Sequence, residues 1–171
     1  MNRSINLVVL SFVTSVVLLA DQIIKYFVYK EIPQSGFLLF KNNVFAVNFV
    51  HQLNENVAFS LPTGRVVSVI VSAALICAVV WMFVKNRNCL SRQLSVLVAL
   101  VIGSALSNLI DRVRFGGVFD FFSIQVAGIS WPTFNLADAI ISLSAVYLII
   151  LLIRKEGYEK NINCHNISDR N

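Results

Sequence analysis

Charged residues are scarce in this chain of 171 residues, of which 13% are charged and 57% are hydrophobic. Soluble domains usually carry about 25% charged residues. The shortage of charge therefore excludes an ordinary soluble domain and predicts an all-α integral membrane protein, with a single membrane domain over residues 1–171. The net charge of +5 does not indicate a nucleic-acid partner, because most basic residues flank apolar runs and none are interleaved with aromatic residues.

Histidine and cysteine are also rare, which limits the chemistry open to the chain. The two histidines, His51 and His165, lie far apart in the sequence, and no His-Glu-x-x-His motif occurs. The three cysteines, Cys77, Cys89 and Cys164, match neither a metal site nor a disulfide framework. We therefore expect neither a metal ion nor a cofactor.

Four long apolar runs predict four transmembrane helices, because about 20 apolar residues cross the hydrocarbon core of a bilayer. The first run also fits a signal peptide, since Arg3 precedes it. It lacks a small-x-small cleavage site, however, and continues into Asp21 and Lys25, which favours a retained helix. The predicted spans cover about residues 5–27, 66–84, 94–110 and 137–153.

Basic residues predict the orientation of these spans. Four spans place both termini on one side, together with Arg3, the basic loop 85–92 and the pair Arg154 and Lys155. The positive-inside rule makes this side the cytoplasm, so the tail 156–171 is expected there. Residues 29–65 and 112–136 are then outer loops, although they carry some basic residues as well.

The first outer loop contains the predicted β structure. Phenylalanine, valine and leucine are frequent between residues 37 and 50, and Lys41, Asn42 and Asn43 interrupt them. This pattern predicts two short strands around a turn, which form a small extracytoplasmic β element. Because both faces of these strands are partly apolar, we expect them to lie against the membrane surface.

Polar residues gather at the outer ends of the predicted helices, whereas the inner ends carry only basic flanks. Charges beside hydrocarbon are costly, so this asymmetry predicts a functional site at the outer surface. Asp120 and Asp138 are both flanked by apolar residues on that face, and we interpret them as the acid/base pair of a membrane peptidase. The other polar residues that meet there are Asp21, Lys25, Asn54, Asn108, Asp111 and Arg112.

Paired carboxylic acids suit peptide hydrolysis because two close carboxylates share one proton. The charged acid activates water, and the neutral acid polarises the scissile carbonyl and later protonates the leaving amine. Simpler interpretations remain open for both residues. Asp138 fits a helix N-terminus with Asn135 as its cap, and Asp120 fits a turn after Gly117.

The remaining charged residues are expected to be structural. Asp21 and Lys25 are four residues apart and share a helix face, so they are expected to pin the first helix to the polar layer. Asp111 and Arg112 are interpreted as a structural ion pair or as a helix end at the membrane interface. Asn108 is expected to hydrogen-bond between helices and to support the site.

Two other functions stay open on this reasoning. Ser104 or Ser107 could act as a nucleophile with Lys25 as its base. The chain could also be a small transporter that uses Asp21, Asp111 and Asp138 as an ion or proton relay. Carboxylates of a relay should lie nearer the middle of the bilayer than these helix ends, which counts against a transporter.

Five motifs in order resemble those of the lipoprotein signal peptidases, also called signal peptidase II, from about Ala20 to Ile141. Asn56 stands where that family usually has glycine, and Ser104 and Ser107 stand at positions that are small and often glycine. The motifs are Asp21-Gln22-x-x-Lys25, Asn54-x-Asn56-x-Ala58-Phe59, Gly103 through Asn108-x-x-Asp111-Arg112, Gly117-Val118-Phe119-Asp120-Phe121 and Phe134-Asn135-x-Ala137-Asp138.

The resemblance implies a four-helix aspartyl endopeptidase of the bacterial cytoplasmic (inner) membrane, with its active site at the outer face. It would cut prolipoproteins before a cysteine that carries diacylglycerol, and globomycin-type cyclic peptides would inhibit it. Asp120 and Asp138 would be the catalytic residues. We expect a monomer whose partners are these precursors and membrane lipids. By the same resemblance, the residues that position the substrate or the catalytic carboxylates would be Asn54, Asn108, Arg112 and Asn135.

Overall fold

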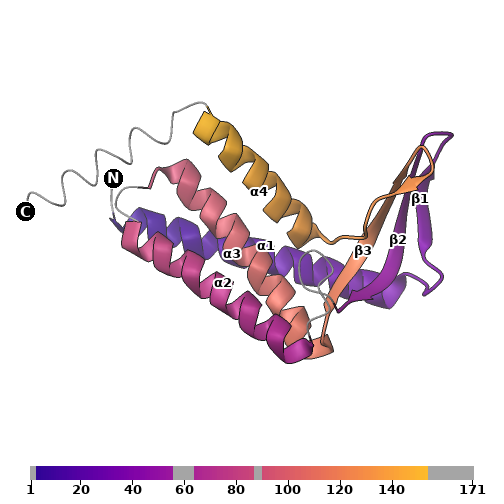
Figure 1. Cartoon of the computed structure of the whole chain (residues 1–171), viewed down its shortest axis with the longest axis horizontal. Helices are drawn as coiled ribbons and strands as arrows, with labels where there is room; N and C mark the ends of the chain where they lie inside the picture. Colours follow the sequence, from indigo (N-terminus) through magenta and orange to yellow (C-terminus); the bar gives the residue numbers. More distant parts are fainter. Residues whose placement is uncertain (1–2, 56–63, 87–89, 154–171) are drawn as a thin grey trace, which may run out of the picture.

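The computed structural model describes residues 3–55, 64–86 and 90–153. The motif residues Asn56, Ala58 and Phe59 and the predicted tail 156–171 lie outside these ranges. The described chain forms a bundle of helices with a small antiparallel sheet at one end, as Figure 1 shows. The helices are α1 (Arg3–Glu31), α2 (Arg65–Asn86), α3 (Arg92–Phe115) and α4 (Leu136–Ile153).

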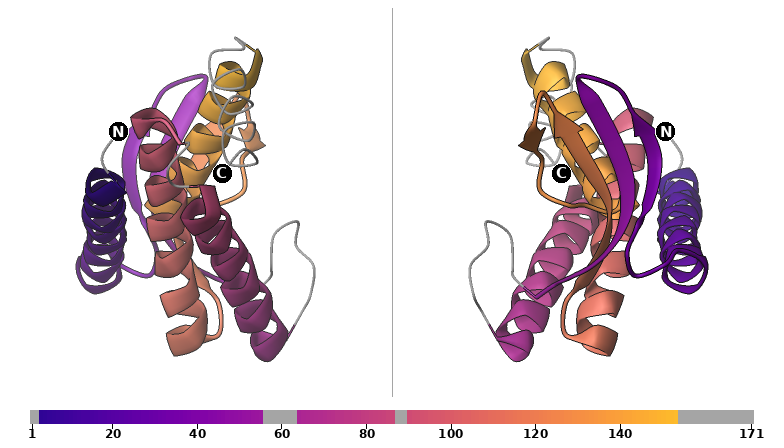
Figure 2. Two further views of the ribbon diagram at one scale, coloured as in Figure 1. Left: turned by 90° about the vertical axis from the view of Figure 1, so that its left-hand side faces the viewer. Right: turned by 90° about the vertical axis from the view of Figure 1, so that its right-hand side faces the viewer.

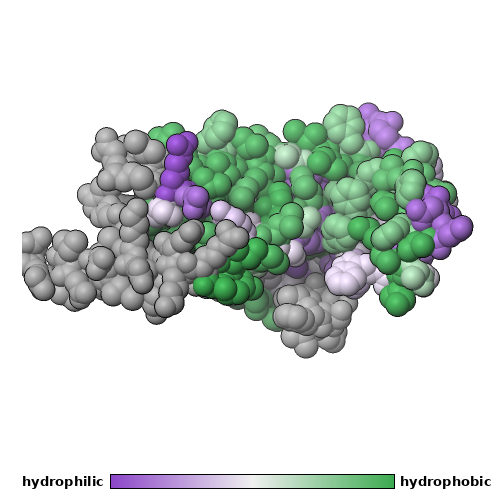
Figure 3. Space-filling model, turned by 90° about the horizontal axis from the view of Figure 1, so that it is seen from above, coloured by the Kyte–Doolittle hydropathy of each residue, from purple (hydrophilic) through white to green (hydrophobic). Residues whose placement is uncertain are grey.

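Three of the helices, α1, α2 and α3, are long and apolar enough to cross a membrane, and α4 is apolar but shorter. Each helix contains one predicted span, and α3 continues to Phe115, into the predicted outer loop 112–136. Large apolar side chains such as Phe12, Ile70 and Trp81 are exposed on the helices. Figure 3 shows hydrophobic residues along the middle of one face and hydrophilic patches toward its ends, as expected for a multi-pass membrane protein.

The helix α3 is the centre of the bundle, because α1, α2 and α4 all pack against it (Figure 2). Small residues allow this close packing. Ser95, Ala99, Ser104 and Ser107 are fully buried, and a Cβ atom on Gly103 would lie 2.7 Å from the carbonyl oxygen of Thr14 on α1. The helix ends at Gly116, whose φ of 83° fits the left-handed region that glycine adopts without strain.

The sheet has the strand order β1-β2-β3-β4 and is antiparallel throughout. Strands β1 (Phe37–Lys41) and β2 (Phe45–Asn54) confirm the two predicted strands and their turn, where Asn42 accepts hydrogen bonds from the next backbone amides. Strands β3 (Val118–Val126) and β4 (Ile129–Ser130) come from the second connection. The sequence analysis did not predict these two strands, because the glycines and aromatic residues near Asp120 resemble a turn.

The helices alternate in direction, so their functional ends meet at the sheet. Figure 1 shows α1 and α3 running toward the sheet, and α2 and α4 running away from it. The C-terminal ends of α1 and α3 therefore lie at the same end of the bundle as the N-terminal ends of α2 and α4. This arrangement brings the polar segments that the sequence analysis singled out to one end of the molecule.

Replacement of Gly103 by alanine should destabilise the protein, because the added methyl group collides with the backbone of Thr14. Overpacking of this kind typically costs about 1–3 kcal/mol. Thermal unfolding of the purified protein in detergent measures the loss. Gly64→Ala is the matched control, since no atom lies within 4 Å of a Cβ atom at Gly64. Equal unfolding temperatures for Gly103→Ala and Gly64→Ala would contradict the close α1–α3 contact.

Candidate functional site

Asp120 and Asp138 line one cavity of about 730 Å³ at the end of the bundle. Asp120 lies on β3 and is 1% exposed, whereas Asp138 lies in the first turn of α4 and is partly exposed. Apolar side chains of α2, α3 and α4, such as Leu75 and Ile102, form much of the wall. The two acids, which are 18 residues apart (138 − 120), therefore face a common space with an apolar side.

Two asparagines connect the carboxylates of this pair. The Nδ2 group of Asn135 donates to Asp120 Oδ1 at 2.9 Å and to Asn108 Oδ1 at 3.1 Å. The Nδ2 group of Asn108 in turn donates to Asp138 Oδ1 at 2.9 Å. Because both amide oxygens are occupied by donors, each NH₂ group is directed at a carboxylate. Asn108 thus hydrogen-bonds between helices, as predicted.

Asn135 also caps α4, which confirms that part of the sequence analysis. Its Oδ1 accepts from the backbone N–H of Asp138 at 2.9 Å, and Asp138 Oδ2 accepts from the backbone N–H of Asn135 at 3.3 Å. This reciprocal pattern is that of a capping box. The cap fixes Asp138 at the start of the helix, while its partly exposed carboxylate still lines the cavity.

Asn54 supports Asp120 from the end of β2. Its Nδ2 group donates to Asp120 Oδ2 at 3.1 Å, so both oxygens of this carboxylate accept an amide hydrogen bond. Asp120 is not in a turn, since it pairs with Gln52 across the two strands. Gly117 permits this geometry, because a Cβ atom there would lie 2.8 Å from the backbone oxygen of Asn54.

Burial raises the pKa of Asp120 from its ordinary value of 3.8 to about 6. The negative charge of Asp138 raises this pKa further, whereas the amide hydrogen bonds of Asn54 and Asn135 and the distant charge of Lys25 lower it. Asp120 is therefore the member of the pair that retains a proton more readily than an ordinary aspartic acid. An acid that keeps its proton to a higher pH than usual, close to a second carboxylate, is suited to general acid catalysis.

Arg112 lines the same cavity and is half-buried. Its Nη1 group donates to the backbone oxygen of Asn108 at 3.4 Å, one turn earlier in α3. The predicted ion pair between Asp111 and Arg112 was wrong, because Asp111 pairs with Lys25 instead. Neighbouring residues on an α-helix point about 100° apart, so Arg112 faces the cavity while Asp111 faces α1.

Lys25 on α1 is the centre of a buried charge cluster behind the cavity. Its Nζ atom lies 2.7 Å from Asp21 Oδ2 and 2.7 Å from Asp111 Oδ2, and it donates to Asn108 Oδ1 at 3.1 Å. All three N–H groups of the ammonium are thus directed at oxygen atoms. The prediction that Asp21 and Lys25 share a helix face is confirmed, and their partners on α3 connect the cluster to the candidate pair.

Asp21 anchors the start of α4 to α1. Its Oδ1 accepts from the backbone N–H of Ala137 at 3.0 Å, and its Oδ2 accepts from Ser107 Oγ at 2.6 Å. Gln22, a residue of the first motif to which the sequence analysis assigned no separate role, donates to Ser107 Oγ and to Asp111 Oδ1, each at 2.9 Å. Its position next to Asp21 and three residues before Lys25 was the sequence signal that could have assigned it to the same polar cluster.

These contacts leave little support for nucleophilic catalysis by serine. Ser107 donates to Asp21, and Lys25 is engaged by two carboxylates, so neither is arranged as a serine–lysine pair. His51 bonds the backbone oxygen of Ile32 and lines a different cavity. Within the described parts of the chain, no group of three or more histidine, cysteine, aspartate or glutamate residues could hold a metal ion.

Comparisons with known proteins point to one family. The family described as "Signal peptidase (SPase) II" matches residues 13–154. The chain is 33% identical to a lipoprotein signal peptidase of Halothermothrix orenii over 84% of this chain and 94% of that protein. It is 32% identical to a lipoprotein signal peptidase of Anaplasma phagocytophilum over 85% of this chain and 92% of that protein.

A solved structure of a bacterial membrane enzyme is similar to the chain, with a TM-score of 0.72 and 25% identity, over 86% of this chain and 88% of that one. A second structure with the same description has a TM-score of 0.69 and 26% identity, over 84% and 91% of the two chains. The fold is therefore that of a membrane enzyme.

The hydroxyl groups of Ser107 and Ser104 should differ in their contribution to stability. Ser107→Ala removes hydrogen bonds to Asp21 and Gln22 and should cost about 1–3 kcal/mol. Ser104→Ala should be neutral or stabilising, because Ser104 Oγ is buried without a hydrogen-bond partner. Denaturant unfolding of the two variants measures the difference, and an equal loss for both would contradict the hydrogen-bond network.

The raised pKa of Asp120 predicts a pH-dependent contribution to stability. Between about pH 4 and 6 the folded protein holds a proton on Asp120 that the unfolded chain has released. The stabilising contribution of Asp120 therefore decreases as the pH rises through this window and is constant above it. The unfolding temperature of Asp120→Asn should rise relative to wild type from pH 4 to pH 6. A difference independent of pH would show that the pKa is not raised.

Proposed function

This chain belongs to the lipoprotein signal peptidase family, also called signal peptidase II, and on that premise we propose that it cleaves prolipoprotein signal peptides as an aspartyl endopeptidase. The proposed cut lies just before the cysteine that carries diacylglycerol. The observation that carries this proposal is that Asp120 and Asp138 face one cavity and are connected by Asn135 and Asn108. No other pair of carboxylates in the described residues lines that cavity.

The two acids have different environments, which suggests separate roles. Asp120 is deeply buried and has a pKa near 6, so it is the acid that holds the shared proton. Asp138 is partly exposed to the cavity, where its carboxylate can take a proton from water. The activated water attacks the scissile carbonyl, which Asp120 polarises, and Asp120 then protonates the leaving amine.

Arg112 and the asparagines are proposed to position the reacting groups. Asn108 and Asn135 hold the carboxylates, while Asn54 holds Asp120 from the opposite side. The guanidinium of Arg112 reaches the cavity with only one hydrogen bond among the contacts of the described residues. It can therefore donate to a carbonyl oxygen of the substrate.

The apolar wall of the cavity suits a substrate that reaches the acids from the lipid bilayer. Residues of α2, α3 and α4 line this wall, including Val71, Val79 and Ile141. A scissile bond beside a lipid-modified cysteine would bring an apolar group to the polar acids. The cavity has both a polar surface, which carries the acids, and an apolar surface. A site for a soluble polar peptide would not need the apolar surface.

The proposed placement is in the bacterial inner membrane with four spans, both termini in the cytoplasm and the active site at the outer face. The helix α4 has 18 residues, which at about 1.5 Å per residue gives about 27 Å, close to the thickness of the hydrocarbon core. We propose that the enzyme acts as a monomer. All the acids assigned to an alternative transporter lie at the sheet end of the bundle, which favours surface chemistry over a relay.

Asp120→Asn and Asp138→Asn should each abolish cleavage while the protein remains folded. Loss of a general acid or base typically lowers a rate by about 10²–10⁴-fold. The measurement uses purified full-length protein in detergent and a diacylglyceryl-modified prolipoprotein, with release of the signal peptide followed by gel electrophoresis. Thermal unfolding checks that each variant is folded, and globomycin should stop cleavage by the wild type.

Asp111→Asn is the matched control, because it makes the same chemical change in the buried cluster rather than in the cavity. It should mainly lower stability, since Lys25 loses one of its two carboxylate partners. A folded Asp120→Asn variant with full activity would refute the assignment of the catalytic pair. A stable but inactive Asp111→Asn variant would instead mean that another acid performs the reaction.

A further inference from the structure

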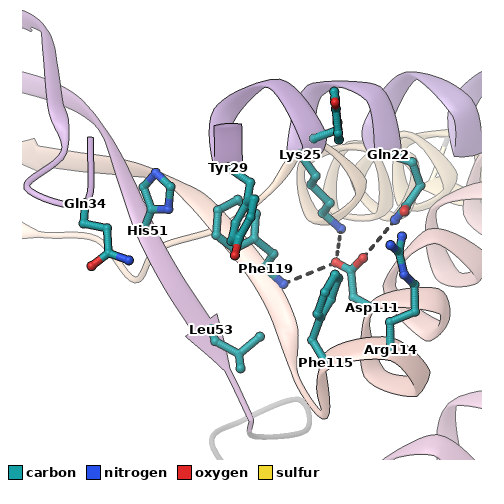
Figure 4. Close-up of a pocket in the computed structure, with 11 residues that line it drawn as sticks. Gln22, Lys25, Tyr29, Gln34, His51, Leu53, Asp111, Arg114, Phe115 and Phe119 are labelled. Atoms are coloured by element: carbon teal, nitrogen blue, oxygen red, sulfur yellow. Dashed lines mark hydrogen bonds and ion pairs between the residues drawn. The ribbon is translucent and has the colours of Figure 1, made fainter. Parts of the chain in front are cut away.

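A second cavity of about 580 Å³ lies between α1, α3 and the sheet. Figure 4 shows Gln22, Asp111 and Arg114 on one side of it and His51 and Gln34 on the other. This volume is in the range of small-molecule sites, which is about 300–1,000 Å³. The cavity contains neither Asp120 nor Asp138, and nothing in the proposed reaction uses it.

The charged groups on the floor of this cavity are already engaged with one another. The dashed lines in Figure 4 mark the bonds of Asp111 to Lys25, Gln22 and the backbone N–H of Phe119. All N–H groups of the Lys25 ammonium are engaged as well. The floor therefore offers no free cation to a ligand.

Arg114 is the remaining cation of the cavity. Its side chain is exposed, and its guanidinium carbon lies 5.0 Å from the centre of the Phe115 ring. No carboxylate among the described residues forms an ion pair with it. The guanidinium group thus keeps its donors for an anion, and phosphate is an anion that arginine binds with two parallel hydrogen bonds.

The walls of the cavity place it at the level where a bilayer changes from hydrocarbon to head groups. Tyr26, Tyr29 and Phe115 line the cavity and are each more than half exposed, at 60%, 69% and 52%. Tyrosine is enriched at membrane–water interfaces, where its ring contacts lipid and its hydroxyl contacts water. The cavity also lies at the C-terminal ends of the apolar helices α1 and α3, so in the proposed membrane placement its opening faces phospholipid head groups.

We propose that this second cavity binds the phosphate head group of a phospholipid, with Arg114 as the main phosphate ligand and the aromatic rings against the glycerol and upper acyl chains. This proposal does not depend on the peptidase reaction. The charge, the aromatic walls and the location all fit a molecule with apolar acyl chains and an anionic head group.

A lipid in this cavity would contact the reverse side of the candidate active site. Phe119 and Leu53 are paired across strands β3 and β2 and both line the second cavity. The residues next to them, Asp120 and Asn54, line the first cavity, because successive side chains of a strand point to opposite faces. The bound head group would therefore brace the two strands that carry Asp120 and Asn54.

Native mass spectrometry of the purified full-length protein in detergent tests the proposal by titration with phosphatidylglycerol. Arg114→Gln should weaken binding about tenfold, as expected for loss of a charge-assisted hydrogen bond. Lys41→Gln is the control, because it removes an exposed cation of β1 that does not line the cavity. Leu53→Trp, which fills the cavity without a change in charge, should weaken binding as well.

Further measurements separate the possible sources of the phosphate. Diacylglycerol with the same acyl chains should bind at least tenfold more weakly than phosphatidylglycerol to the wild type. Phosphatidylglycerol should also raise the unfolding temperature of the wild type and of Lys41→Gln more than that of Arg114→Gln. Equal affinities of wild type, Arg114→Gln and Leu53→Trp would overturn the proposal. Arg114-dependent binding of inorganic phosphate without binding of the lipid would also overturn it.

Discussion

A lysine ammonium buried between two carboxylates determines how the functional end of this protein is assembled. Lys25 on α1 contacts Asp21 on its own helix and Asp111 on α3, and all three residues are at most 5% exposed. Loss of one partner from such a buried pair typically costs about 3–5 kcal/mol, so the register of the two helices is strongly constrained here. The same ammonium donates to Asn108, which directs the NH₂ group of that asparagine toward Asp138.

The candidate catalytic acids are held by neutral amides rather than by cations. Asn54 and Asn135 bond Asp120, and Asn108 bonds Asp138. The ammonium of Lys25 bonds Asn108 and neither candidate catalytic acid directly. An arginine or lysine bonded directly to Asp120 would lower its pKa, whereas burial and the nearby Asp138 charge raise it to about 6. The asparagines thus fix the geometry of the pair and leave one acid able to keep its proton.

The sheet separates two cavities with different character. Strands β2 and β3 present Asn54 and Asp120 to one side and Leu53 and Phe119 to the other. A bulge in β2, where the register shifts between Phe49 and Gln52, sets which side chains of this strand oppose Asp120. Because a strand cannot shift one face without the other, contacts in the second cavity are mechanically connected to the acids in the first cavity.

The amino-acid sequence by itself determined the membrane class, the four helices, the first two strands and the set of polar residues at one end. These features depend on local composition, on the length of apolar runs and on spacing within one helix, all of which can be read along the chain. The sequence did not determine that β3 joins the sheet, that Asp111 pairs with Lys25 rather than Arg112, or that two asparagines connect Asp120 to Asp138. Only the tertiary structure decided these contacts, because they join residues 15 to 86 positions apart, whose partners depend on how the helices pack around α3 and not on any local period.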